Sequence, residues 1–263
     1  GIPYFPQSMV TPEYLEKNGV NRPDLHLNGA AYNPQTGTWA LAQAIYPGEV
    51  FKPDDSIVQE LLALLPEADF FGEEGDHAKL TQPWTFIVDP IDGTTNFVRR
   101  LHYSNISVAL AHDGQVEYAV VYDPFADELF SAQKDCGAFC NGLPIRVSDK
   151  DVAHAVFLCG STIYDRSLTE RSFSLMRQLY EKGLDFRRFG AAALDLCQVA
   201  AGRVELFYEC RLSPWDYAAG SLIVAEAGGT VTTLADTPLD VLHPSSVFAT
   251  NAKCHGVLKE LAL

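Results

Sequence analysis

The sequence predicts an α+β protein built from layers of helices and sheets. Apolar segments separated by turn residues between Trp84 and Gly142 indicate an antiparallel sheet, and strands alternate with helices after residue 150. Because helices and sheets each have an apolar face to bury, such a succession is stable when the elements stack in layers. The 263 residues are enough for one large domain, or two joined halves, with a substantial core.

The first 50 residues contain few regular patterns. Turn residues such as Asn28-Gly29 interrupt them, and Trp39–Ile45 is one of the short apolar stretches between these turns. The pattern sharpens from Asp55, because Ser56 can cap a helix that ends at Pro66. Its apolar stripe consists of Ile57, Val58, Leu61, Leu62 and Leu65.

An antiparallel sheet is expected next. Trp84–Val88 has the composition of a strand, and Ile106–Ala111 and Val116–Tyr122 flank the hairpin signal His112-Asp113-Gly114. Leu129–Ala132 and a strand turning at Asn141-Gly142 extend this sheet.

The rest of the chain alternates between strands and helices. The expected strands include Ala155–Cys159, Glu205–Tyr208 and Thr230–Thr233, and the expected helices include Ser167–Lys182, Ala191–Ala201 and one that begins at Ser213. We expect an N-terminal α+β half, residues 1–150, and a C-terminal α/β half, residues 151–263, that share one interface and form one compact catalytic unit.

Composition restricts the class of partner. The chain has 19 basic and 34 acidic residues, a net charge of −15, and such a surface repels phosphodiester backbones, so no nucleic-acid partner is expected. No apolar run approaches the roughly 18 residues of a membrane span, and Gly1–Pro6 has no basic segment before an apolar one. We therefore expect a cytoplasmic protein without a membrane partner. The six scattered cysteines are expected to be reduced structural thiols.

Three acidic segments lie where regular elements are expected to end. In the second of them, Pro90 is expected to end the strand directly after Asp89, and Gly93 permits a tight turn after Asp92. In the third, Ser213 is the expected N-cap of a helix that carries Asp216 in its first turn. The three segments are Phe70–Gly75, Trp84–Asn96 and Ser213–Gly220.

Carboxylates from these segments can converge only where positive charge offsets their repulsion. Nearby cationic side chains are few: Lys79, Arg99 and Arg100. A bound hard cation supplies the missing charge, and oxygen ligands select magnesium, manganese or calcium. The spacing of Asp89 and Asp92 does not match an EF-hand calcium loop.

The segment after Asp92 adds a second feature. The backbone amides of Gly93, Thr94 and Thr95 lie at an expected helix start, where they can bind a phosphate oxyanion. Metal carboxylates beside such amides indicate phosphoryl transfer to water.

These motifs resemble those of a known family. Gly72-Glu73-Glu74, Asp89–Phe97 and Trp215–Gly220 are similar to three signatures of the inositol monophosphatase family, and the similarity runs from about Asp55 to the C-terminus. The resemblance implies a layered α-β-α-β-α sandwich of the sugar phosphatase type and a homodimer. It also implies lithium-sensitive, magnesium-dependent hydrolysis of a small phosphomonoester without a phosphoenzyme. Further matching segments are Gly137–Gly142, Phe189–Ala193 and Glu226–Gly229.

The resemblance also implies residue roles. It predicts two or three Mg²⁺ ions, with Mn²⁺ as a substitute. The first metal would be held by Glu73, Asp89 and the carbonyl oxygen of Ile91, and the second by Asp89, Asp92 and Asp216. The phosphate would be bound by Gly93, Thr94 and Thr95, and the substrate alcohol would be contacted by Ala192, Glu209 and Asp216. The implied catalytic residues are Thr94 and an upstream aspartate, which would activate the water, and Glu73.

Residues 1–50 depart from the family, since they lack its long opening helix. Asp55 fits best as the water-activating aspartate and third-metal ligand, and the alternative is that it only caps the following helix. Other phosphatase classes do not fit, because Asp89 and Asp92 are not an Asp-x-Asp pair, and Cys159 and Arg166 enclose six residues where cysteine phosphatases have five.

Thr94–Phe97 and Glu209 most resemble the inositol monophosphatases of the family, and this resemblance implies inositol monophosphate as the substrate. The alternatives are histidinol phosphate or another sugar or nucleotide phosphate of the same family. A catalytically weakened regulatory or binding member, suggested by the atypical first 50 residues, is the competing hypothesis.

Overall fold

The computed structural model describes residues 25–33, 38–46, 57–73, 80–163 and 165–262, with side chains from residue 61 onward. The predicted Asp55 lies outside the described residues. None of the helices in these ranges combines the length and apolar character that a membrane span requires.

A seven-stranded sheet forms one layer. Its first two neighbouring strands are parallel and all the following pairs are antiparallel. The predicted hairpin at His112–Gly114 is confirmed, and Asp113 and Gly114 have the positive φ angles, 48° and 75°, that a tight two-residue turn requires. In sheet order the strands are β3 (Asp69–Gly72), β4 (Trp84–Asp92), β5 (Asn105–His112), β6 (Gln115–Asp123), β7 (Glu128–Gln133), β8 (Ala138–Cys140) and β9 (Leu143–Ile145).

A five-stranded mixed sheet forms a second layer. Its central strand β12 is parallel to β10 on one side and antiparallel to β14 on the other. The strand β14 has no counterpart among the predicted elements. In sheet order the strands are β11 (Asp185–Arg187), β10 (Val156–Cys159), β12 (Leu206–Leu212), β14 (Ser245–Thr250) and β13 (Thr230–Thr232).

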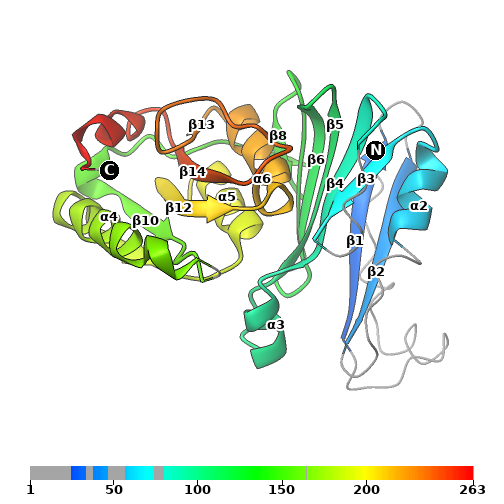
Figure 1. Ribbon diagram of the computed structural model, residues 1–263, viewed down its shortest axis with the longest axis horizontal. Coiled ribbons are helices and arrows are strands. Elements are labelled where there is room, and N and C mark those ends of the chain that lie inside the picture. The colour runs from blue at the N-terminus through cyan, green and yellow to red at the C-terminus, as the bar shows by residue number, and fades with distance from the viewer. Residues whose placement is uncertain (1–24, 34–37, 47–56, 74–79, 164, 263) are drawn as a thin grey trace.

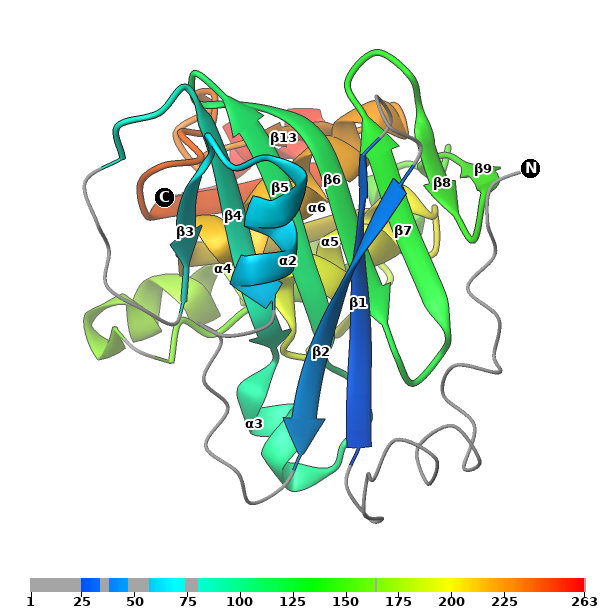
Figure 2. The same cartoon turned by 90° about the vertical axis from the view of Figure 1, so that its right-hand side faces the viewer.

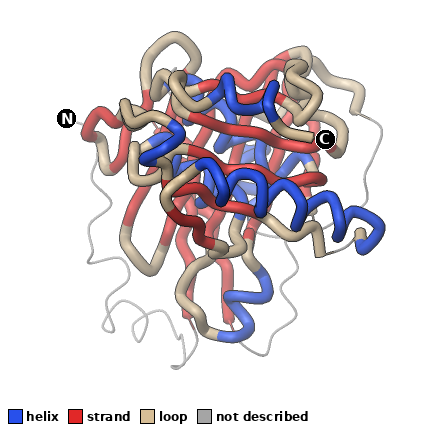
Figure 3. Tube along the Cα trace, turned by 90° about the vertical axis from the view of Figure 1, so that its left-hand side faces the viewer, coloured by secondary structure: helices blue, strands red, loops and turns tan. Residues whose placement is uncertain are grey.

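Helices α5 (Ala192–Ala200) and α6 (Pro214–Glu226) lie between the two sheets (Figure 1). Helix α4 (Thr169–Lys182) covers the outer face of the five-stranded sheet (Figures 1 and 3). Together with α2 (Ile57–Leu64) outside the seven-stranded sheet (Figure 2), these layers confirm the α-β-α-β-α architecture that the family resemblance implies.

The outer face of the seven-stranded sheet is covered by α2 (Ile57–Leu64) and by a hairpin of β1 (Leu25–Asn33) and β2 (Thr38–Tyr46) (Figure 2). The helix after Ser56 was predicted, but the hairpin was not. Asn28-Gly29, interpreted as a turn signal, lies inside β1 and pairs with Gln43 and Ala42. Cross-strand pairing therefore overrides the local turn preference of these two residues.

The two central helices are almost entirely buried because small residues allow them to approach closely. A Cβ atom added to Gly220 of α6 would lie 2.6 Å from a side-chain carbon of Leu196 on α5. This close packing fixes the start of each helix relative to the sheets. The buried residues of α5 and α6 include Ala193, Leu194, Val199, Ala218 and Ala219.

The predicted end of strand β4 is wrong. Strand β4 does not end after Asp89 but continues through Pro90 to Asp92. The pairing with β5 shifts its register between Asp89 and Asp92, so this part of the strand is a bulge. A bulge leaves a residue outside the ladder of hydrogen bonds, and proline is tolerated there because it has no N–H to donate.

Candidate metal centre

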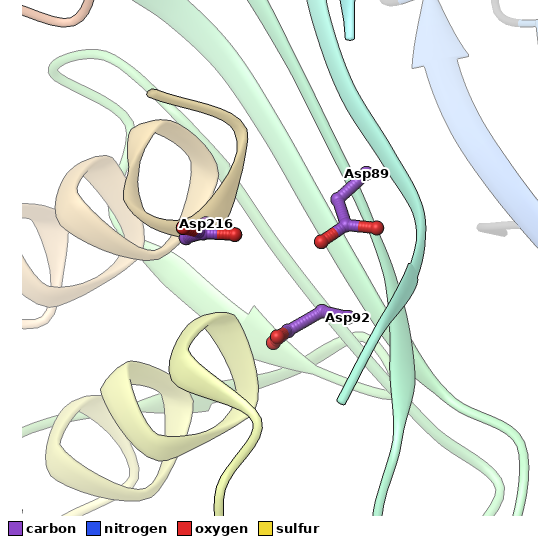
Figure 4. A group of neighbouring side chains, drawn as sticks. All are labelled: Asp89, Asp92 and Asp216. Carbon is purple, nitrogen blue, oxygen red and sulfur yellow. The ribbon is translucent and has the colours of Figure 1, made fainter. Parts of the chain in front are cut away.

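Three aspartates lie together where the seven-stranded sheet meets the central helices. Asp89 and Asp92 come from β4, and Asp216 comes from the first turn of α6 (Figure 4). Each offers one carboxylate oxygen, and these three oxygens all lie within 4.8 Å of one another. The convergence predicted from the three acidic segments is thus confirmed for these three residues.

Local hydrogen bonds orient two of the carboxylates. The backbone N–H of Ile91 donates to Asp89 Oδ1 at 2.9 Å, and the N–H of Ser213 donates to Asp216 Oδ2 at 2.8 Å. The second contact is part of the predicted N-terminal cap of α6, in which Pro214 occupies the first helical position. Backbone amides at the end of β4 and directly before α6 therefore orient both carboxylates toward the same site.

Asp92 is held by three donors. Its Oδ2 accepts from Asn105 Nδ2 and from the backbone N–H of Ala193, both at 2.8 Å, and its Oδ1 accepts from the N–H of Ala192 at 3.2 Å. Ala192 was predicted to contact the substrate alcohol, which stays a prediction. The structure shows that its amide orients Asp92.

The electrostatics of the cluster favour a bound cation. Burial raises the pKa of Asp89 well above its usual range, and the nearby charges of Asp92, Glu73 and Asp216 raise it further. Burial, followed by the charge of Asp92, also raises the pKa of Asp216. Burial raises the pKa of Asp92, although its hydrogen-bond donors oppose the shift. Among the described residues, none of the ion pairs involves these three aspartates.

This donor set fits a hard divalent cation. All three ligands are carboxylate oxygens, Asp89 and Asp92 are only 1% and 6% exposed, and two positive charges would replace the mutual repulsion by attraction. Such oxygen ligands suit Mg²⁺ and Mn²⁺.

The raised pKa values predict that protons compete with the metal. A proton held by a buried aspartate must leave before the carboxylate can bind a cation, so affinity falls as the pH falls. We expect Mn²⁺ affinity, measured by electron paramagnetic resonance, to be lower at pH 6 than at pH 8, because ordinary carboxylates are ionised at both values and only carboxylates with raised pKa values take up protons in this interval. An affinity unchanged over this interval would show that the carboxylates titrate in their ordinary range, near pH 4.

The other predicted metal ligands lie beside this cluster. Glu73 follows β3, its N–H donates to the carbonyl of Val88 at 3.3 Å, and its charge raises the pKa of Asp89 and Asp216. The carbonyl oxygen of Ile91 accepts from Thr94 Oγ1 at 3.2 Å. Ligation of a metal by Glu73 and Ile91 stays a prediction.

The predicted phosphate-binding turn follows Asp92 directly. Gly93 has a φ of 83°, a left-handed conformation that favours glycine, and it precedes the short helix α3 (Thr94–Arg99). A Cβ atom at Gly93 would also lie 2.9 Å from the Cβ of Ala191. Thr94 and Thr95 are exposed at the start of α3, where their amides are available to an anion.

Glu209 lies in β12, which extends beyond its predicted end at Tyr208. Its Oε1 accepts from the N–H of Thr162 at 2.8 Å, and burial raises its pKa to about 7. The charge of Asp92 contributes to this shift, and the guanidinium of Arg188 opposes it. Glu209 is therefore electrostatically coupled to the aspartate cluster, as a residue that contacts the substrate alcohol would be.

Sequence reasoning missed a further buried carboxylate near the cluster. Asp195 in α5 is 1% exposed and accepts a hydrogen bond from the hydroxyl of Tyr103 at 2.8 Å. Burial raises the pKa of Asp195, and the charges of Asp92 and Glu209 raise it further. The signal in the sequence was an acidic residue between leucines in a mostly apolar helix.

The comparison with protein families shows to which family the chain belongs. Residues 53–263 match the model of the inositol monophosphatase family. The chain belongs to this family. The resemblance found in the three sequence signatures is thereby confirmed.

Relatives inside the family carry two kinds of name. The Nus factor SuhB of Salmonella typhimurium strain LT2 is 43% identical over 160 residues, which is 60% of each chain. The solved inositol monophosphatase from Anabaena is 33% identical, with a TM-score of 0.73 over 79% of this chain and 83% of the other. Inositol monophosphate-bound SaIMPase-II is 28% identical, with a TM-score of 0.70 over 79% and 81%. The match thus spans about 60% of the length of the SuhB relative.

Proposed function

We propose that this protein hydrolyses a small phosphomonoester with Mg²⁺, and that inositol monophosphate is its substrate. The observation that carries the proposal is the buried cluster of Asp89, Asp92 and Asp216 directly beside the Gly93 turn. Membership of the family supports it, and so does the similarity to a protein solved with inositol monophosphate bound.

Each group of the site has a separate role in the proposed reaction. Bound Mg²⁺ would supply a Lewis acid that stabilises negative charge on the phosphate and on the attacking and leaving oxygens. The amides of Gly93 and Thr94 orient the phosphate, and the Thr94 hydroxyl orients the attacking water. Glu209 accepts hydrogen bonds from hydroxyl groups of the substrate alcohol. Sensitivity to lithium and a homodimer stay predictions from the family.

A phosphate-release panel tests the substrate. It contains inositol 1-phosphate, histidinol phosphate, fructose 1,6-bisphosphate, NADP and phosphoadenosine phosphate. We expect the highest kcat/KM with inositol 1-phosphate. A higher kcat/KM with histidinol phosphate would still support a phosphomonoesterase activity, but it would identify histidinol phosphate as the substrate in place of inositol monophosphate.

The role of Glu209 can be tested by comparing a variant that moves its carboxylate with a variant that removes its charge. A Cβ atom at Gly160 would lie 1.8 Å from Glu209 Oε2, so Gly160→Ala must displace the carboxylate while keeping its charge. Glu209→Gln instead keeps the shape and removes the charge. Because a lost acceptor leaves substrate hydroxyls unpaired at ~1–3 kcal/mol, both variants should lower kcat/KM for inositol 1-phosphate by about tenfold or more. They should affect 4-nitrophenyl phosphate much less, and equal losses on both substrates would assign Glu209 a purely structural role.

A regulatory or binding function is the second candidate. Some relatives are named Nus factor SuhB, and this name does not describe an enzymatic activity. The net charge of −15 argues against direct binding of nucleic acid, so such a role would use a protein surface. A protein that binds metal but releases no phosphate from the panel would favour this candidate.

A further inference from the structure

Asn96 is a buried polar residue that the proposed reaction does not use. It lies in α3, is 4% exposed, and donates two hydrogen bonds through the same amide nitrogen. One goes to the carbonyl of Tyr103 at 2.8 Å and the other to the carbonyl of Phe189 at 2.7 Å. Both N–H groups of the side chain are therefore used, and they join segments 86 residues apart in the chain.

Each of these segments leads into a donor that holds Asp92. Tyr103 precedes Asn105 by two residues, and the side chain of Asn105 donates to Asp92 at 2.8 Å. Phe189 precedes Ala192 by three residues, and the first N–H groups of α5 donate to the same carboxylate. Asn96 thus ties together the two chain segments from which all three of these donors come.

The turn after Asp92 is packed against the same segments. A Cβ atom at Gly93 would lie 2.9 Å from the Cβ of Ala191 and 3.1 Å from the carbonyl oxygen of Tyr103. A small displacement of either segment would therefore move the turn as well as the donors. Contacts between the rings of Tyr103 and Phe189, with centroids 4.8 Å apart, connect the two segments a second time.

We propose that Asn96 is a positioning residue that sets the orientation of the Asp92 carboxylate. It acts through the carbonyls of Tyr103 and Phe189, which fix Asn105 and the start of α5 relative to the Gly93 turn. The inference rests on the proposed function only in treating Asp92 as a metal ligand. Groups that orient metal ligands typically change metal affinity or activity 10- to 100-fold when they are removed.

The test compares two buried asparagines. Asn96→Leu keeps the size of the side chain and removes both donors. The matched control is Asn251→Leu, because Asn251 is fully buried and donates to the carbonyl of Lys150 at 2.9 Å, away from the metal centre. For each variant, Mn²⁺ affinity is measured by electron paramagnetic resonance, the melting temperature is measured without metal, and kcat and KM are measured at saturating Mg²⁺.

Both variants should melt at a lower temperature than the wild type. Only Asn96→Leu should lose Mn²⁺ affinity, by about tenfold or more, with a lower kcat and a nearly unchanged KM. Asn96→Ser, which retains one donor and places less apolar volume in the core, should show an intermediate loss. This variant keeps the proposal testable if Asn96→Leu does not fold.

Two results would overturn the positioning role. One is wild-type Mn²⁺ affinity in the Asn96 variants, and the other is an equal loss of affinity in Asn251→Leu. The proposed function fails separately, if the wild-type protein binds Mn²⁺ but releases no phosphate from any substrate of the panel. In that case the comparison of Mn²⁺ affinities still decides whether Asn96 positions Asp92.

Discussion

Asp89→Asn is expected to lower kcat/KM by about 10³-fold or more, the scale of losing a major electrostatic contribution to the transition state. Asp89 is the most deeply buried of the three clustered carboxylates, and by family resemblance it would hold both metals. Asparagine keeps the shape of the side chain but removes its charge. The loss should therefore accompany a loss of Mn²⁺ affinity.

The same substitution should stabilise the metal-free protein. Burial and the neighbouring carboxylates raise the pKa of Asp89, so its ionised form is unfavourable in the folded state near neutral pH. Removing that charge should raise the metal-free melting temperature by at least about 2 °C, and metal should then raise it less than in the wild type. A higher stability combined with lost activity is typical of a functional cluster.

Glu205→Gln is the matched control for Asp89→Asn. Glu205 is a fully buried carboxylate away from the aspartate cluster, and its Oε2 accepts from the N–H of Val156 at 2.7 Å. We expect the control to lower stability and to leave Mn²⁺ affinity unchanged. Full activity of Asp89→Asn in Mg²⁺ would contradict the assignment of Asp89 as a metal ligand.

Thr94→Ala is expected to reduce turnover by ~10²-fold or more, the scale of losing assistance to proton transfer. In the structure the Thr94 hydroxyl donates to the carbonyl of Ile91 at 3.2 Å, on the exposed side of the turn. A hydroxyl has a single proton, so in the proposed reaction Thr94 exchanges its contact with Ile91 for donation to a carboxylate, and its oxygen accepts from the attacking water. Asp55→Asn should reduce turnover to a similar extent if Asp55 is that carboxylate.

The double variant distinguishes a catalytic pair from two helix caps. If Thr94 and Asp55 act as a unit, the double variant should be little slower than either single variant. Stability does not discriminate, because a lost cap also costs ~1 kcal/mol. Near-normal turnover of Asp55→Asn at saturating Mg²⁺, while Thr94→Ala is impaired, would show that Asp55 is only a helix cap. The water-activating carboxylate would then be Asp54 or a residue of the segment 1–50.

The aspartate cluster could be predicted because its positions are determined locally. Asp89 and Asp92 flank a proline in the last four residues of β4, and Asp216 lies in the first turn of a capped helix. The exact end of β4 could not be predicted, because Pro90 is accommodated by a bulge that depends on pairing with β5.

The residues that support the cluster could not be predicted from the sequence. Asn96 and Tyr103 act on backbone carbonyls or carboxylates that lie 93 and 92 residues away along the chain. Such contacts exist only once α5 packs between the sheets. The β1–β2 hairpin was missed for a similar reason, since tertiary pairing overrode the turn signal at Asn28-Gly29.

The most direct test of the central claim is phosphate release from inositol 1-phosphate by the wild-type protein, measured in Mg²⁺ and then in excess chelator. We predict release that depends on Mg²⁺, stops with chelator and returns when Mg²⁺ is restored. Undiminished release after exhaustive chelation would contradict the metal centre. Absence of release at every Mg²⁺ concentration, from a protein that binds Mn²⁺, would contradict the proposed hydrolysis of inositol monophosphate.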